Sequence, residues 1–282
     1  MKVQFDPFIV EYEPITSPIL DFKSECVMAV NNALSHNTQN LPVILMMSGG
    51  IDSELVGEAL LLANVSFRCM ICRLLYINHA GETIILNEHD YYLAEKWCLK
   101  NNIKVEYCEL DIFKESSLIS EYALLSDGFS PQLASHLYTM KLCTERGYFF
   151  ITGHNEIDVV LKDDEYFIFD EQRDCTFDKF CHLYKLNGIY RFWKQDSRLI
   201  SAYLQLPTVK LLMSKKIKRI LDHKHECYAD IFQFEPRIKQ TGFERIQEWD
   251  ASIRTPMRKI NGKYDSKFYT SITQFQFNQE FL

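Results

Sequence analysis

The chain has 282 residues, of which 47% are hydrophobic and 13% aromatic, and its formal net charge is −7. This composition is typical of a folded globule, either one large domain or a core with an appendage, and it excludes a disordered chain. No apolar run approaches the roughly 18 residues that cross a bilayer, the start does not resemble a signal peptide, and nine cysteines follow no disulfide framework. We therefore expect a cytoplasmic protein with reduced thiols and no membrane contact.

Strands and helices are predicted to alternate over the first 160 residues. A short edge strand is expected at 3–12, and Ser17 with Pro18 has the cap-and-proline pattern that begins a helix, here ending near residue 35. This alternation predicts an α/β fold with a doubly wound parallel sheet, in which ligands bind at the carboxyl ends of the strands. Buried strands are expected at 43–47, 67–77, 104–110 and 148–152, and further helices at 53–64, 87–101, 111–125 and 130–146.

The rest of the chain is predicted to be helical and irregular. A hairpin insertion is expected within 163–190, and the final alternating residues, 275–278, predict an edge strand. Helices are expected at 197–206 and at 211–225, the second strongly basic. We expect residues 1–160 to form the nucleotide-binding domain and residues 161–282 a substrate or lid region that packs on it.

Charge is unevenly distributed along the chain. Residues 1–206 hold 17 Lys and Arg against 29 Asp and Glu, whereas residues 207–268 hold 14 against 8. A basic segment on an acidic body indicates an element that faces phosphate or nucleic acid, although a solvated helical face would have the same composition.

The most informative stretch is Ser-Gly-Gly-Ile-Asp-Ser at 48–53, between a predicted strand and a predicted helix. Two adjacent glycines allow a sharp turn and the close approach of a ligand, and free amides at a helix start favour an anion. The stretch lacks the Lys-Ser or Lys-Thr pair of the usual mononucleotide loop. The predicted anion site comprises the amides of Gly49, Gly50, Ile51, Asp52 and Ser53 and the hydroxyls of Ser48 and Ser53.

This loop resembles the Ser-Gly-Gly-x-Asp-Ser motif of the PP-loop ATP pyrophosphatases, which include asparagine synthetase, GMP synthetase, NAD synthetase and the 7-cyano-7-deazaguanine synthases. Strand and helix flank it as the family requires; the alternative is an ordinary strand-to-helix turn. A second stretch, from Thr152 to Asp158, is similar to the family's second nucleotide motif, with Asp158 five residues after Gly153. Together with the helix before the first strand, these matches cover about residues 17–160.

The resemblance implies an ATP-dependent, AMP-forming synthetase. A substrate oxygen attacks the α-phosphate, pyrophosphate leaves, and a nitrogen or sulfur nucleophile then displaces AMP. Mg2+ neutralises the leaving pyrophosphate and prefers one or two carboxylates plus phosphate oxygens, so Asp52 and Asp158 are the metal candidates. The alternatives are a helix cap for Asp52 and a surface charge for Asp158.

The resemblance also implies where the nucleotide binds. In the family, adenine contacts the backbone at the ends of the first two strands, which correspond here to Met46 and to Cys72 or Arg73. Thr152 and Gly153 would lie against the nucleotide, since a glycine leaves no side chain in the way.

A cation is needed near the α-phosphate, and several basic residues after position 190 are possible. Lys194 and Lys239 are favoured, and with Asp52 they form the predicted catalytic set. The wider set of candidates is Arg191, Lys194, Arg198, Lys210, Lys215, Lys216 and Lys239.

The cysteines and histidines argue against a thiolation or zinc-bearing branch. Cys69 and Cys72 are three apart within a predicted strand and so face opposite sides, and His223 and His225 lie on different faces of a predicted helix. We therefore read these residues as structural or surface residues.

The leading expectation is an asparagine-synthetase-like enzyme that adenylylates a small-molecule acceptor. Only about forty residues precede the loop, so ammonia would be free or delivered by a separate protein. Two alternatives remain: a tRNA- or DNA-modifying enzyme that binds nucleic acid through residues 207–268, and an ATP-binding module without turnover. An oligomer is possible.

Overall fold

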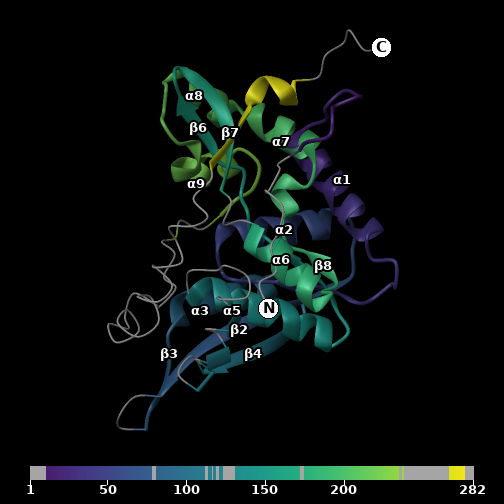
Figure 1. The fold of residues 1–282 in the computed structure, drawn as a ribbon, viewed down its shortest axis with the longest axis vertical. Helices are drawn as coiled ribbons and strands as arrows, with labels where there is room; N and C mark the ends of the chain where they lie inside the picture. Colours follow the sequence, from purple (N-terminus) through teal and green to yellow (C-terminus); the bar gives the residue numbers. More distant parts are fainter. Residues whose placement is uncertain are drawn as a thin grey trace.

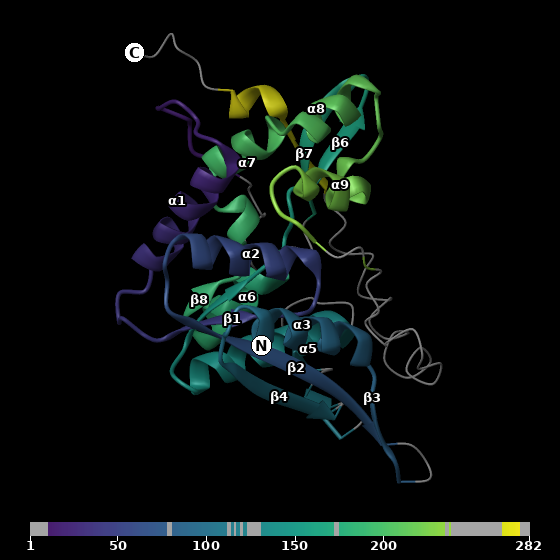
Figure 2. The same cartoon turned by 180° about the vertical axis from the view of Figure 1, so that it is seen from behind.

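The structure is a computed structural model, elongated in shape, with a larger sheet at one end and a smaller sheet at the other (Figures 1 and 2). The residues that it describes are 11–77, 81–111, 114–115, 117–118, 121–122, 131–171, 175–234, 237 and 267–276.

The larger sheet is mostly parallel. Its strands lie in the order β4-β2-β1-β5-β8, and β3 pairs antiparallel with the last residues of β2, beyond the end of β1. All four buried strands predicted for this part of the chain are confirmed within two residues, whereas β3 and β8 were not predicted. The strands are β1 (Val43–Met46), β2 (Phe67–Ile77), β3 (Thr83–Ile85), β4 (Val105–Asp111), β5 (Phe149–Thr152) and β8 (Gly188–Ile189).

Helices cover both faces of this sheet, because alternate strand residues face opposite sides. Leu45 of β1 packs in the core cluster that includes residues of α1, α2 and α3, whereas its neighbour Ile44 packs with α5 and α6. The predicted α/β class, with a parallel sheet covered on both faces, is therefore confirmed. The helices are α1 (Phe22–Ser35), α2 (Ile51–Leu62), α3 (Glu88–Lys100), α5 (Pro131–Glu145) and α6 (Cys175–Tyr184).

Two predictions near the N-terminus differ from the structure or fall outside it. Helix α1 begins at Phe22 rather than at Ser17, because Asp21 caps it by accepting from the Ser24 amide at 3.2 Å. The carbonyl of Ser17 instead accepts from Arg198 at 3.2 Å. Most of the edge strand predicted at 3–12 and most of the helix predicted at 111–125 lie outside the described residues, and the described Glu11 and Tyr12 are not in a strand.

The smaller sheet is antiparallel and consists of β6 (Val159–Lys162), β7 (Glu165–Glu171) and β9 (Lys267–Ser271). The hairpin predicted within 163–190 is present, but it starts earlier and ends at Glu171. Its turn is made by Asp163 and Asp164, both with positive φ (50° and 65°), a conformation that Asp tolerates better than most residues.

The basic helix predicted at 211–225 is wrong, because the chain divides there into three short pieces. Lys216 adopts a φ of 54°, which ends the preceding helix, and the chain then runs beside β6 before turning again. The edge strand predicted at 275–278 is not formed at its first two residues, since Phe275 ends a 3-10 helix and Gln276 follows it, and residues 277–278 lie outside the described residues. The remaining elements are η2 (Phe192–Lys194), α7 (Ser197–Leu204), α8 (Pro207–Ser214), η3 (Ile220–His223), α9 (Lys224–Ala229) and η7 (Ile272–Phe275).

One hydrophobic cluster connects the two ends of the molecule. It contains Leu45 and Leu55 from the larger sheet and α2, and also Ile168 and Phe275 from the smaller sheet and η7. Strand β8 lies in the larger sheet although it follows residue 160, so the division at that residue stays a prediction. Among the described residues, no helix is both long and apolar enough to span a bilayer.

Candidate functional site

The Ser-Gly-Gly loop connects the carboxyl end of β1 to the start of α2. Gly49 has a φ of 76°, and a Cβ on it would lie 1.9 Å from the carbonyl oxygen of Asp90 in α3. Both features require glycine here. Gly50 has an extended conformation and is the N-cap residue of α2, without a side-chain cap.

The two serine hydroxyls hold the loop in shape. Ser53 Oγ donates to the Gly50 carbonyl at 2.9 Å and accepts from the Ser48 amide at 3.2 Å. Ser48 Oγ lies 3.1 Å from Ser53 Oγ and accepts from the Gly50 amide at 3.3 Å. Their predicted role as donors to a ligand stays a prediction.

In the part of the chain that the structure describes, the amides of Ile51, Asp52 and Ser53 have no protein acceptor. Such amides at a helix start carry partial positive charge, which favours a bound anion.

A cavity of about 120 Å³ opens at the carboxyl ends of β1 and β5 and beside the middle of β2. Polar residues line it at the loop, at the end of β5 and on α5, and its apolar side is formed by methionines of β1, β2 and α5 with Phe177. The lining brings together seven of the predicted site residues, including Cys72, the alternative to Arg73: Met46, Ser48, Asp52, Ser53, Cys72, Thr152 and Gly153.

The end of β5 packs tightly against the start of α2. A Cβ on Gly153 would lie 2.7 Å from the Ser53 amide nitrogen, so only glycine allows this contact. Thr152 Oγ1 donates to the Tyr190 carbonyl at 3.0 Å and accepts from the His154 amide at 3.2 Å. The turn then places Glu156 beside the loop, where it also lines the cavity.

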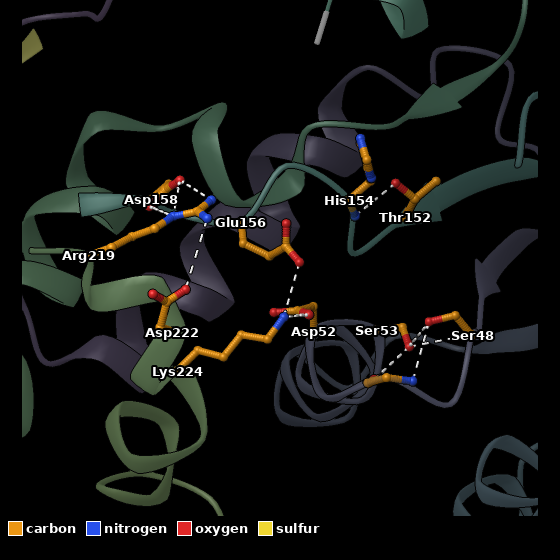
Figure 3. A network of polar contacts seen from close by, with 11 residues as sticks. Ser48, Asp52, Ser53, Thr152, His154, Glu156, Asp158, Arg219, Asp222 and Lys224 are labelled. Atoms are coloured by element: carbon orange, nitrogen blue, oxygen red, sulfur yellow. Dashed lines mark hydrogen bonds and ion pairs between the residues drawn. The ribbon is translucent and has the colours of Figure 1, made fainter. Parts of the chain in front are cut away.

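Two carboxylates share one ammonium at this point (Figure 3). Lys224, the first residue of α9, donates to Asp52 Oδ2 and, at 3.1 Å, to Glu156 Oε1. Asp52 is 8% exposed, and its other oxygen, Oδ1, is buried with no hydrogen-bond partner in the described structure.

The pKa values of the two carboxyls are driven apart. Burial raises the pKa of Asp52 to about 7, the Glu156 carboxylate adds to this increase, and the Lys224 ammonium opposes it. Burial also raises the pKa of Glu156, but the Lys224 ammonium, a backbone hydrogen bond and His154 together outweigh that effect and bring it to about 2. The two carboxyls therefore titrate as a coupled pair, because the second carboxyl ionises next to an existing charge.

Asp158, the second predicted metal ligand, is occupied by an arginine. Arg219 Nε lies 3.1 Å from both carboxylate oxygens, and its Nη2 donates to Oδ2 at 2.7 Å. Figure 3 shows this pair beside the Lys224 cluster but turned away from Asp52. The Oδ1 of Asp52, which has no hydrogen-bond partner in the described structure, fits a hard cation such as Mg2+. Glu156 shares Lys224 with Asp52, whereas Asp158 is paired with Arg219. Among the described residues, no group of three or more His, Cys, Asp or Glu could hold a metal.

Two other predicted residues are engaged elsewhere. Arg73 lies over the rings of Tyr91 and Tyr107, 4.6 and 4.2 Å from their centroids, and is not among the residues that line the cavity. Lys194 is buried, donating to the Phe169 carbonyl at 2.8 Å and to Asp170 at 2.9 Å.

Lys239 lies outside the described residues. Another cation from the C-terminal part contacts the loop instead: Arg237 donates to the Gly49 carbonyl at 3.0 Å and pairs with Glu54 at 2.5 Å. Glu156, Lys224 and Arg237 are not among the site residues predicted from the sequence. Glu156 lay within the motif already quoted, whereas nothing in the sequence marked Lys224 among its basic neighbours.

No family model matches the sequence, and no curated protein matches it. Among solved structures, a glutamine-dependent NAD+ synthetase from Acinetobacter baumannii, in complex with adenosine diphosphate, gives a TM-score of 0.38 at 15% identity. That alignment covers 84% of this chain and 50% of the other, so this protein spans half the length of that synthetase.

Two further structures give similar values. NMN synthetase from Francisella tularensis has a TM-score of 0.35 at 13% identity, over 83% of this chain and 94% of the other. The U34-tRNA thiolase NcsA from Methanococcus maripaludis has a TM-score of 0.36 at 12% identity, over 86% and 80%. At such scores the likenesses carry no argument about activity, which rests on the site's own residues.

Proposed function

We propose that the protein is an ATP-dependent, AMP-forming synthetase. The proposal rests on one observation. Amides at the start of α2 that have no protein acceptor and the unpartnered Oδ1 of Asp52 lie together at one cavity, at the carboxyl edge of a parallel sheet. This is where an α/β sheet binds ligands, and it combines an anion site with a cation ligand, as a metal-bound polyphosphate requires.

The cavity suits a nucleotide in a defined orientation. The phosphates lie at the amides of Ile51, Asp52 and Ser53, where the helix dipole favours negative charge. The purine occupies the apolar side, between Met46 and Phe177, which lies on the α5 and α6 face of the sheet.

Asp52 holds the divalent cation, assisted by Glu156. When bound, Mg2+ supplies charge neutralisation for the departing pyrophosphate. The loop amides do the same at fixed positions, because Gly49 and the two serine hydroxyls keep them in place before the ligand arrives.

The reaction proceeds in two displacements. An oxygen of the acceptor attacks the α-phosphorus, the bond to the bridging oxygen breaks, and pyrophosphate leaves with the electron pair. A nitrogen nucleophile, ammonia in the asparagine-synthetase-like version, then attacks the activated carbon and releases AMP. The acceptor is a small carboxylate or carbonyl compound.

The cation near the phosphates is better assigned to Lys224 than to Lys194. Lys224 reaches the cluster at the cavity, whereas the ammonium of Lys194 is already satisfied by Phe169 and Asp170. Lys239 stays a candidate from the sequence alone.

Product analysis tests this function. Purified protein, Mg-ATP and a small-molecule fraction of a cell extract are incubated, and AMP and pyrophosphate are measured for the wild type, for Asp52→Ala and for the surface control Asp164→Ala. We expect both products from the wild type and control, with at least a hundredfold loss in Asp52→Ala. Formation of ADP, or equal AMP in all three proteins, would contradict the mechanism, and ATP binding without any product would support an ATP-binding module instead.

A nucleic-acid acceptor is the second candidate. Exposed Lys215, Lys216 and Lys218 lie together between α8 and η3, within the basic segment 207–268. If this surface binds tRNA or DNA, affinity should fall steeply as salt rises, because each phosphate contact releases counterions. Absence of binding at low salt would remove this candidate.

A further inference from the structure

Among the described residues, only Lys224 connects the C-terminal helices directly to both carboxylates of the candidate metal site, those of Asp52 and Glu156. It comes from the start of α9, 172 residues after Asp52 and 68 after Glu156. Its side chain is 22% exposed, so the ion pairs are largely shielded from solvent. Because shielding strengthens charge–charge interactions, these contacts are not equivalent to a surface salt bridge.

The ammonium occupies ligand positions that a metal needs. It contacts one oxygen of Asp52 and one of Glu156, which leaves Asp52 Oδ1 as a buried oxygen without a partner. A magnesium ion takes oxygen ligands at about 2.0–2.1 Å and demands near-octahedral geometry. An ammonium in hydrogen-bond contact with the same oxygens would face that ion at close range, and like charges at such distances repel strongly.

The charge balance points the same way. When both carboxyls are ionised, two carboxylates and one ammonium leave one negative charge in a largely buried cluster. A dication would neutralise both carboxylates without the ammonium. The cluster is thus only partly compensated by Lys224, while a metal ion compensates it fully.

We propose that Lys224 is an internal counter-ion that pairs with Asp52 and Glu156 in the metal-free protein and is displaced when a divalent cation binds these two carboxylates. The inference rests on the proposed function in placing the cation at Asp52. The displaced ammonium then contacts the phosphates of the nucleotide that binds with the metal. The start of α9, which carries Lys224, thereby moves from the two carboxylates to the nucleotide. Arg237 is held separately, by Gly49 and Glu54, and does not take part in the exchange.

Metal binding without nucleotide provides the first test. Mn2+ affinity is measured by electron paramagnetic resonance for the wild type, for Lys224→Met and for Lys210→Met, an exposed lysine of α8. We expect Lys224→Met to bind Mn2+ at least about tenfold more tightly, equivalent to about 1.4 kcal/mol, and Lys210→Met to match the wild type. Equal or weaker binding by a folded Lys224→Met protein would overturn the proposal.

Amine labelling of the wild-type protein provides a second test that does not depend on the variant folding. The protein is treated briefly with acetic anhydride with and without Mn2+, and modification is quantified by mass spectrometry. We expect Lys224 to be labelled several-fold faster with Mn2+, while Lys210 is unchanged. Unchanged labelling of Lys224 at saturating Mn2+, or no saturable Mn2+ binding at all, would overturn the exchange.

These results are separable from failure of the proposed function. Absence of AMP formation with a normal Mn2+ response would reject the synthetase reaction and leave the exchange intact. Normal AMP formation without any change in Lys224 labelling on addition of Mn2+ would support the synthetase reaction and reject the exchange.

Discussion

At the scale of single residues, the two adjacent glycines of the loop have different physical roles. Gly49 has a positive φ and lies against the Asp90 backbone, so a side chain there meets both strain and a collision. Gly50 has an ordinary φ, and a Cβ on it would meet only Ser48 Oγ at 3.3 Å. The sequence marks both glycines equally; only the structure distinguishes them.

We therefore expect Gly49→Ala to lower the free energy of unfolding by at least about 2 kcal/mol, and Gly50→Ala by about 1 kcal/mol or less. Urea unfolding followed by circular dichroism measures both. Equal losses in the two variants would show that neither the positive φ nor the Asp90 contact controls the loop.

The raised pKa of Asp52 predicts a pH-dependent stability cost. Burial raises this pKa from 3.8 to about 7, so the unfolded carboxyl ionises while the folded one still holds its proton. Stability from this group therefore falls as pH rises from about 4 to about 7, and the full cost is present above 7.

Asp52→Asn removes this cost, so without metal or nucleotide the variant should be more stable than the wild type at pH 8, by about 1–3 kcal/mol, given about 1.4 kcal/mol per pKa unit. The advantage should shrink towards pH 4. Urea unfolding across this range measures it, and an advantage independent of pH would show that Asp52 is ionised throughout.

At the scale of elements, a buried ion pair between Lys194 and Asp170 connects η2 to β7. Asp170 of β7 is fully buried at its side chain and accepts from Lys194 at 2.9 Å, Arg191 at 3.3 Å and the Tyr12 hydroxyl at 2.9 Å. A lysine so placed has a structural role, because removing one partner of a buried ion pair leaves an uncompensated charge.

Lys194→Met is expected to cost about 3 kcal/mol of unfolding free energy, whereas Lys216→Met, at an exposed pair with Asp164, should cost about 0.5 kcal/mol or less. Urea unfolding gives both values. A Lys194→Met protein of normal stability that has lost AMP formation would instead support the catalytic role predicted from the sequence.

At the scale of the whole molecule, the two sheets belong to one core. Arg198 of α7 binds the buried Glu25 of α1 at 2.6 and 3.0 Å, and Phe22 stacks near Trp193 with centroids 6.5 Å apart. Contacts of this kind cross the predicted division at residue 160, so we expect cooperative unfolding of the described parts together.

The measurement is urea unfolding of variants that retain only Trp97, in α3, or only Trp193, in η2. We expect the two fluorescence midpoints to coincide with each other and with circular dichroism. Separate midpoints would support two independent domains with a boundary near residue 160.

The sequence by itself determined the loop and the four buried strands predicted for the larger sheet. Apolar runs such as 43–47 and the glycine turn after Met47 are local signals, and local backbone preferences act over a few residues. The same signals placed Asp52 and Gly153 at strand ends that a parallel sheet brings to one edge.

Only the tertiary structure decided which charges meet. Asp158 and Glu156 are two residues apart in one motif, yet Arg219 takes the first and Lys224 the second. Lys194 and Lys224 look alike in sequence, but one is buried against Asp170 and the other reaches Asp52. Ion pairs between residues far apart in the chain depend on how the helices pack, and no periodicity within a segment records that arrangement.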